Sequence, residues 1–349
     1  MLEAGDLTPY DRVMSVLNCR SEEADRVPCM NSASTCTLDF MRNFDAFWPE
    51  SHRDSEKMAR LASAAHRQCG LDNVSVPFDM TVEAEVLGAP IDFGEGCLRW
   101  PRAKAFVLRD PSDLKKPKDI SKSGRIPVVI SAIKKLKKEF EGRVVVNAYL
   151  APPFTSIGSY LVDTYAFLTS LVRKPAYVHR LLDEAVDSFA EIALLYQEAG
   201  ADVITLHEMG GSNSSISPRH FEEFVKPYLE VITSKLRVPS ILNICGSAQL
   251  IVGKMAECGV SAISIDEKTS IRKARESIKI DQRYPIIGNV SSRGTINLGP
   301  KAKIREAVKD VISQGVNIVA PGCDFWIETP TEHIRTLVEA TAEFGSPPT

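Results

Sequence analysis

The sequence predicts an α/β fold, specifically a closed (β/α)8 barrel, and three observations lead to it. From about residue 127 onward, short apolar segments alternate with amphipathic helical segments over short connections. This alternation indicates parallel strands with helices packed outside them. Helices that end at a glycine directly before a strand recur at Gly200, Gly259 and Gly315, as expected where glycine takes a left-handed C-cap. The length of 349 residues fits one barrel with extensions.

The first third of the chain is less regular than the rest. Residues 1–25 form a helical lead-in, and residues 88–120 are rich in turns with little periodicity. We interpret 88–120 as an excursion over the barrel mouth, so 1–349 is expected to be a single barrel domain. The expected elements here are a helix at Pro9–Leu17, a first strand introduced by Asp25–Met30, a helix at Ser55–Cys69 and a strand at Asp72–Pro77.

The second part of the chain gives clearer patterns. Pro175 begins a long helix whose apolar residues recur at helical spacing, and Gly200 follows its end. An open doubly wound sheet is the alternative fold, but no GxGxxG follows a first strand to favour it. The other expected elements are helices at Val128–Phe140 and Tyr160–Val172, and strands at Val144–Leu150, Asp202–Leu206, Ile241–Cys245, Ser261–Ile265 and Asn317–Ala320.

Composition and charge exclude several classes of protein. The chain is 44% hydrophobic and 25% charged with a formal charge of -3, which gives no electrostatic reason to expect nucleic acid or an anionic membrane as partner. No apolar run is long enough to span a membrane, and Met1–Asp6 does not resemble a secretory signal. We therefore expect a cytoplasmic protein whose eight cysteines are reduced.

Reactive side chains gather where the predicted strands end. In barrels of this class the chemistry lies at the carboxyl ends of the strands, and packing alone would favour Val, Ile and Leu there. The residues at these ends are Phe78 and Asp79, Pro152 and Pro153, His207 and Glu208, Asn243 and Cys245, Asp266 and Glu267, Gly288 and Asn289, and Gly322 and Cys323.

Two of these cysteines and one carboxylate suggest a metal site. Cys245, Glu267 and Cys323 are suitable zinc ligands, and their wide separation indicates a site assembled by the fold rather than a zinc finger. Two alternatives remain open on spacing alone: the cysteines could simply fill strand ends, and Glu267 could be a surface carboxylate.

Four segments carry a resemblance to a known family. The chain resembles the methylcobamide:coenzyme M methyltransferases of the uroporphyrinogen decarboxylase superfamily, which are barrels, and the likeness extends more weakly over most of its length. The segments are Leu242–Gly246, Ile265–Lys268, Gly288–Ser292 and Ala320–Cys323.

The resemblance implies a set of site residues. Cys245 and Cys323 match two zinc thiolates, and Glu267 matches a carboxylate that occupies the site without substrate. The family has a zinc-binding histidine where this chain has Asn243, and an amide is the weaker donor. His207 could fill the position from the neighbouring strand, the Asn243 amide or a water could complete the shell, or the site could have lost zinc. Asn243 and Glu267 are the expected catalytic residues.

The resemblance also implies the reaction. We expect methyl transfer from a corrinoid (methylcobamide) carried by a partner protein to a zinc-activated thiol such as coenzyme M. Methyl transfer involving tetrahydrofolate and a non-catalytic corrinoid-binding barrel are the alternatives. Phe78, Asp79 and Asn289 are expected to line the cofactor-binding pocket. The sequence leaves the choice between monomer and homodimer open.

Decarboxylation of uroporphyrinogen is disfavoured. The decarboxylases of the superfamily bind their many substrate carboxylates with an arginine-rich N-terminal segment. The corresponding segment here, residues 27–34, contains no arginine after Arg26. A polycarboxylate needs several cations for recognition, so this reaction is not expected.

Overall fold

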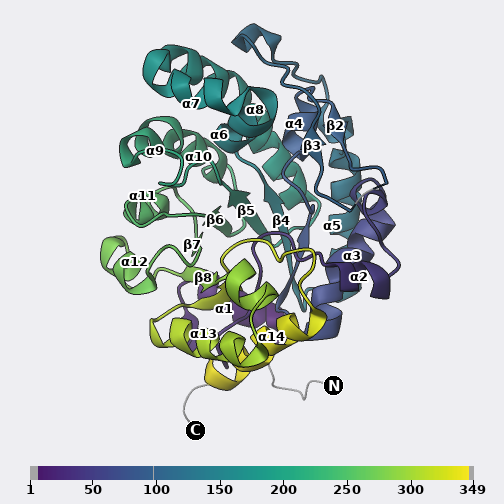
Figure 1. Ribbon diagram of the computed structural model, residues 1–349, viewed down its shortest axis with the longest axis vertical. Coiled ribbons are helices and arrows are strands. Elements are labelled where there is room, and N and C mark those ends of the chain that lie inside the picture. The colour runs from purple at the N-terminus through teal and green to yellow at the C-terminus, as the bar shows by residue number, and fades with distance from the viewer. Residues whose placement is uncertain (1–6, 97, 346–349) are drawn as a thin grey trace.

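One curved sheet of parallel strands forms the centre of the molecule (Figure 1). The computed structural model describes residues 7–96 and 98–345. Neighbouring strands follow the order β1-β4-β5-β6-β7-β8-β9, so each new strand adds beside the preceding one, as in a (β/α)8 barrel. The strands are β1 (Asn73–Val76), β4 (Val145–Leu150), β5 (Val203–His207), β6 (Ser240–Ile244), β7 (Ala262–Ile265), β8 (Ile286–Val290) and β9 (Ile318–Pro321).

A short segment around Cys29 closes the ring of strands. Cys29 forms a parallel bridge with Val319 of β9, and the Asp72 N–H, just before β1, donates to the Cys29 carbonyl at 2.8 Å. The predicted strand at Asp25–Met30 is thus reduced to one bridge in the eighth barrel position. Pro28 helps to explain this shortening, because proline has no N–H to donate to a neighbouring strand.

Helices surround the sheet, and a small hairpin of β2 (Ile91–Asp92) and β3 (Arg102–Ala103) lies in the excursion. The bounds predicted for α1 and α3 are confirmed, and Gly200, Gly259 and Gly315 all have positive φ. The helices are α1 (Pro9–Leu17), α2 (Leu38–Asn43), α3 (Ser55–Cys69), α4 (Val82–Val86), α5 (Ile126–Phe140), α6 (Pro153–Ser156), α7 (Thr164–Arg173), α8 (Pro175–Glu198), α9 (Pro218–Phe224), α10 (Lys226–Thr233), α11 (Val252–Ala256), α12 (Ile271–Ser277), α13 (Lys301–Ser313) and α14 (Thr331–Gly345).

None of the helices in the described ranges is long and apolar enough to cross a bilayer. The N-terminal residues Met1–Asp6, on which the absence of a secretory signal was judged, lie outside those ranges, as does Cys97.

The barrel interior changes from apolar to polar along the strands. The layer nearest the amino-terminal ends of the strands, here called the lower layer at the lower end of the barrel, is a buried apolar cluster. It includes Val145, Val203, Ile241, Ala262, Ile287 and Ile318. Two positions further along five of these strands, on the same face, the residues are Asn147, Thr205, Asn243, Ser264 and Asn289. Most of this polar layer is hydrogen-bonded, as buried polar groups must be: Thr205 Oγ1 donates to Asn147 Oδ1 at 2.8 Å, for example. Asn243 is the exception discussed below.

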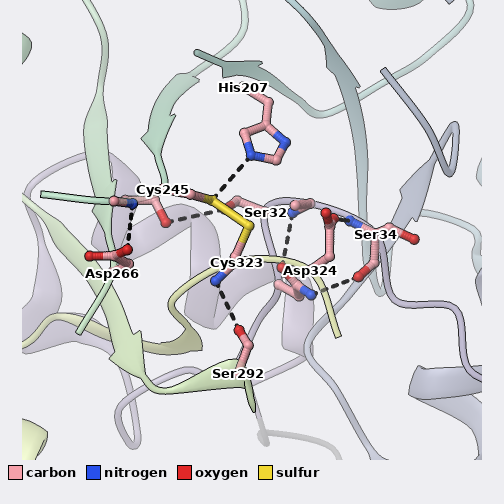
Figure 2. The surroundings of a disulfide bond; sticks show 12 residues. Ser32, Ser34, His207, Cys245, Asp266, Ser292, Cys323 and Asp324 are labelled. Carbon is pink, nitrogen blue, oxygen red and sulfur yellow. Dashed lines mark hydrogen bonds between the residues drawn. A yellow bond between two sulfur atoms is a disulfide. The ribbon is translucent and has the colours of Figure 1, made fainter. Parts of the chain in front are cut away.

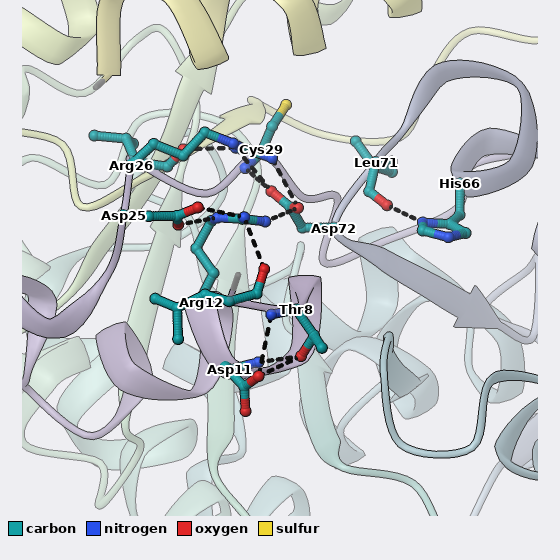
Figure 3. Close-up of polar contacts among 11 residues, drawn as sticks. Thr8, Asp11, Arg12, Asp25, Arg26, Cys29, His66, Leu71 and Asp72 are labelled. Carbon is teal, nitrogen blue, oxygen red and sulfur yellow. Dashed lines mark hydrogen bonds and ion pairs between the residues drawn. The ribbon is translucent and has the colours of Figure 1, made fainter. Parts of the chain in front are cut away.

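Helix α1 covers the lower end of the barrel. Val13, Val16 and Leu17 belong to the same buried cluster as the lower strand layer. Arg12 fastens the helix from its other side (Figure 3): its guanidinium donates to Asp25 at 2.6 and 2.8 Å and to the buried Asp72 at 2.8 Å. The described part of the lead-in, residues 7–25, therefore packs directly against the barrel.

We expect Arg12→Met to lower the free energy of unfolding by about 2–3 kcal/mol, as measured by urea denaturation. The substitution leaves Asp72 buried with one cation fewer, while Arg26 still donates to it. The control is Arg20→Met, which breaks an ion pair with Glu23 whose side chains are 53% and 48% exposed. It should change stability by less than about 0.5 kcal/mol. Equal effects of the two substitutions would contradict the role given to Arg12.

Candidate functional site

Three potential metal ligands meet at the carboxyl ends of the strands. His207 ends β5, Cys245 follows β6 and Cys323 follows β9. One ligand atom from each lies within 4.8 Å of the others, and His207 Nε2 is 3.3 Å from Cys245 Sγ (Figure 2). Of the four residues predicted as metal ligands, the fold thus brings three together, and the two cysteines among them are 78 residues apart in the sequence.

The two cysteines are joined as a disulfide with a Cα–Cα distance of 5.8 Å. The sequence predicts reduced cysteines, so this pair departs from the expectation, whereas Cys19, Cys29, Cys36, Cys69 and Cys258 are free thiols. A disulfide and a pair of metal-binding thiolates are alternative states of the same two sulfur atoms. Both need the side chains to point at each other, and the strand ends provide that arrangement.

Strand register sets the positions of His207 and Cys245. His207 is the register partner of Asn243, so both face the barrel interior, and Cys245 lies two positions beyond Asn243. Gly246 then turns the chain with φ +95°, a conformation that favours glycine. On the opposite side, the Cys323 N–H donates to Ser292 Oγ at 3.1 Å, which fixes the loop that carries this thiol.

The chemistry of the ligand set fits a zinc ion. His207 is fully buried and its Nδ1 has no hydrogen-bond partner among the described residues. Burial lowers the pKa of His207 to about 4, so the imidazole is neutral, the form that binds a metal. Two thiolates and one imidazole are common zinc ligands and leave a position for a further ligand.

Asn243 is a second buried group without partners. The residue is only 1% exposed, and neither Nδ2 nor Oδ1 of its side chain has a hydrogen-bond partner in the described chain. Leaving such an amide unsatisfied costs about 1–3 kcal/mol, so the position suits a group that is bound during function. This observation keeps the predicted catalytic role of Asn243 open without testing it.

Glu267 lies beside the three ligands and not among them. Among the described residues, the possible metal-binding group consists of His207, Cys245 and Cys323 without the Glu267 carboxylate. Glu267 is exposed, and its carboxylate accepts a hydrogen bond from Ser291 Oγ at 2.8 Å. It is nevertheless close to the Cys323 loop, because a Cβ added at Gly322 would lie 2.7 Å from Glu267 Oε2. Its role as a ligand or catalytic group stays a prediction.

A cavity of about 350 Å³ opens beside Cys323. The described part of the 88–120 excursion contributes Trp100 and Pro101 to it, so this part lies over the barrel mouth as predicted. Other lining residues are Asp79, Met80, Met209 and Asp324. Six aromatic side chains, here called the aromatic wall, make up much of the lining: Phe78, Trp100, Tyr149, Tyr160, Phe325 and Trp326.

The expected cofactor-binding residues have different positions. Phe78 and Asp79 line the cavity, while Asn289 is absent from the lining in the described chain and donates to the carbonyls of Asp266 and Thr269 at 2.9 and 2.7 Å. Asp79 is already paired with Arg125 at 2.6 Å. Burial alone would raise the pKa of Asp79, but the charge of Arg125 and the nearby His52 outweigh it and hold that pKa well below its usual range.

Sequence reasoning missed several residues around the cavity. Asp324 directly follows Cys323, a signal that could have been used; it accepts a hydrogen bond from the Ser34 N–H at 2.7 Å, and burial raises its pKa to about 6. Tyr149 lies near the end of a predicted strand and could also have been found. Trp100 had no signal, because the turn-rich excursion gives no indication of which residue folds inward.

Comparison with known proteins identifies the family of the chain. The family model described as uroporphyrinogen decarboxylase (URO-D) matches residues 8–344. The chain is 32% identical to methylcobamide:CoM methyltransferase MtaA of Methanosarcina barkeri, covering 97% of this chain and 99% of that protein. It is 30% identical to methylated-thiol–coenzyme M methyltransferase of Methanosarcina mazei, covering 98% and 91%.

A solved structure shows the same fold. A methyltransferase from Methanosarcina mazei superposes with a TM-score of 0.91 at 33% identity, over 97% of this chain and 99% of that one. A uroporphyrinogen decarboxylase of Carboxydothermus hydrogenoformans is 25% identical over 94% of this chain. The chain therefore belongs to the uroporphyrinogen decarboxylase (URO-D) family and is a methyltransferase of that family.

Proposed function

We propose that the chain transfers a methyl group from a methylated corrinoid, carried by a partner protein, to a thiol held at His207, Cys245 and Cys323 in their reduced state. The observation that carries the proposal is the meeting of these three ligands at the edge of a cavity large enough for a small molecule. The names of the methyltransferase relatives support the corrinoid donor and coenzyme M as one acceptor.

A zinc ion bound by these ligands would supply a thiolate at neutral pH, since a free thiol has a pKa near 8.5 and is mostly protonated there. The protein's own residues do the rest. His207 offers a neutral imidazole, the aromatic wall excludes water, and the Cys323 loop holds the acceptor at the cavity edge. The corrinoid would supply the methyl group and keep the electron pair of the broken carbon–cobalt bond, while the acceptor sulfur would form the new carbon–sulfur bond.

The cavity does not suit uroporphyrinogen decarboxylation. Among the described residues that line it there is no arginine or lysine. Arg26, the arginine nearest the segment expected to bind a polycarboxylate, donates instead to Asp72 at the lower end of the barrel. The charge around the cavity therefore supports the expectation that decarboxylation is disfavoured.

Metal analysis of the reduced protein tests the proposal. We expect about one zinc per chain, and we expect Asn243→His to bind at least as much. Cys19→Ser, at a free thiol of the lower end, is the matched control and should keep its zinc. A wild-type protein free of metal alongside an Asn243→His variant that gains zinc would show that thiol activation by zinc is wrong for this protein.

A further inference from the structure

The cavity beside Cys323 has two carboxylates and no cation in its described lining. Asp79 and Asp324 are both in its lining, whereas no lysine, arginine or histidine of the described chain is. The remainder of the lining is largely the aromatic wall. A ligand with an anionic tail would therefore meet carboxylates and aromatic faces where it needs hydrogen-bond donors and positive charge.

The nearest buried cation is already occupied. Arg125 is buried and donates to both oxygens of Asp79 at 2.6 and 3.1 Å, to Thr81 Oγ1 at 2.8 Å and to Glu85 at 2.7 Å. Arg125 thus neutralises Asp79 from outside the cavity lining. Recruiting Arg125 for a ligand would break this buried network and leave Asp79 without its main cation.

Asp324 has no such neutralisation. Its carboxylate accepts a hydrogen bond from the Ser34 N–H, and no ion pair to it occurs in the described ranges. Figure 2 shows Asp324 next to Cys323, on the side of the site that faces Ser34. Because Asp324 directly follows Cys323 and lines the same cavity, a substrate bound beside Cys323 would share that cavity with this carboxylate.

One exposed cation lies at the edge of the wall. The Arg293 guanidinium is 4.9 Å from the centre of the Trp326 ring, but Arg293 is not part of the cavity lining and its side chain faces solvent. To pair with an anionic tail in the cavity, the Arg293 side chain would have to move into the lining. Substituting Arg293 therefore tests whether it supplies the countercharge.

We propose that the acceptor is a thiol whose tail is neutral or positively charged, and that Asp324 selects against anionic thiols such as those bearing a sulfonate. The inference rests on the proposed function and narrows its acceptor: coenzyme M, the acceptor in the relatives' names, is 2-mercaptoethanesulfonate and would be disfavoured here. Like charges held close together repel each other, whereas aromatic faces attract cations and accept neutral groups. In turnover the acceptor's thiol proton goes to solvent, its sulfur gains the methyl group, and cobalt retains the electron pair.

Three thiols of similar length distinguish the possibilities: 2-mercaptoethanesulfonate, 2-mercaptoethanol and cysteamine. Methylcobalamin serves as the methyl donor with reduced, zinc-loaded protein, and its absorbance change gives the rate while mass spectrometry identifies the methylated thiol. After correction for thiol ionisation, we expect kcat/KM for the neutral and cationic thiols to exceed that for the sulfonate by roughly tenfold or more. Asp324→Asn should raise kcat/KM for the sulfonate and narrow this gap.

Two outcomes would overturn the inference while leaving methyl transfer intact. One is an equal or higher kcat/KM for the sulfonate in the wild-type protein. The other is a selective loss of sulfonate turnover in Arg293→Ala, which would show that this arginine supplies the countercharge. If none of the three thiols is methylated by zinc-loaded protein, the proposed function itself is wrong.

Discussion

Replacing Cys323 by serine should remove the bound zinc and reduce methyl transfer to a thiol by about a thousandfold or more. Cys323 supplies one of three ligands and also borders the cavity. A serine hydroxyl is a poor zinc ligand because it stays protonated at neutral pH, so the metal loses affinity and the acceptor thiol loses its activation. The measurements are metal content after reduction and the rate with methylcobalamin as donor.

The matched control for this substitution is Cys258→Ser. Cys258 is a free, buried thiol that packs in the core away from the ligands, so this change tests the loss of a thiol without loss of a ligand. We expect it to retain zinc and to lower stability only modestly, by about 1 kcal/mol. Retention of zinc and full activity by Cys323→Ser would remove the basis of the proposed mechanism.

Arg125→Met should destabilise the fold by about 3–5 kcal/mol, the range for breaking one side of a buried ion pair. The substitution removes the cation that pairs with Asp79 and Glu85 and leaves the Asp79 carboxylate buried. Urea unfolding at pH 7 measures the change. The control is Arg53→Met: both guanidinium groups lie over the Phe93 ring, at 4.8 and 4.9 Å, but the ion pair of Arg53 with Glu95 has side chains 45% and 66% exposed.

The pH dependence gives this prediction a second readout. In the wild-type protein the pKa of Asp79 is depressed, so its pairing stabilises the fold above the unfolded-state value of about 4 and is lost as the pH falls through the folded-state pKa. Without Arg125, burial still opposes ionisation and only His52 remains beside the carboxylate, so the pKa of Asp79 should rise and protonation should relieve part of the penalty. The stability difference between wild type and variant should therefore narrow between pH 7 and pH 4; a constant difference would contradict the assignment.

The sequence predicted those parts of the fold that depend on local pattern. Glycine-capped helices such as the one before Gly200, and helices with clear start and stop residues such as Pro9–Leu17, were predicted with the correct bounds. The strand at Asp25–Met30 was predicted too long. Whether a segment next to Pro28 forms one backbone bridge or several depends on its neighbours in the barrel, which local pattern does not reveal.

The candidate site was predictable where it depends on strand ends. Cys245 and His207 follow neighbouring parallel strands, so their approach could be expected from strand order alone. The aromatic wall could not, because it draws Trp100 from the excursion and Trp326 from the loop after β9. Glu267 lies at the predicted, carboxyl-terminal end of the barrel. Its carboxylate, however, accepts a hydrogen bond from Ser291 on the loop after β8, and strand order does not reveal this contact.

Helix α1, which closes the lower end of the barrel, also limits where small molecules can enter and leave. With α1 and the apolar layer filling that end, small molecules near Cys323 exchange with solvent through the same opening that a bulky donor protein would have to approach. Under the proposed function, a donor protein docked there would block this opening. The smaller reactant would then bind before the donor protein, and its methylated form would leave after the donor protein has dissociated.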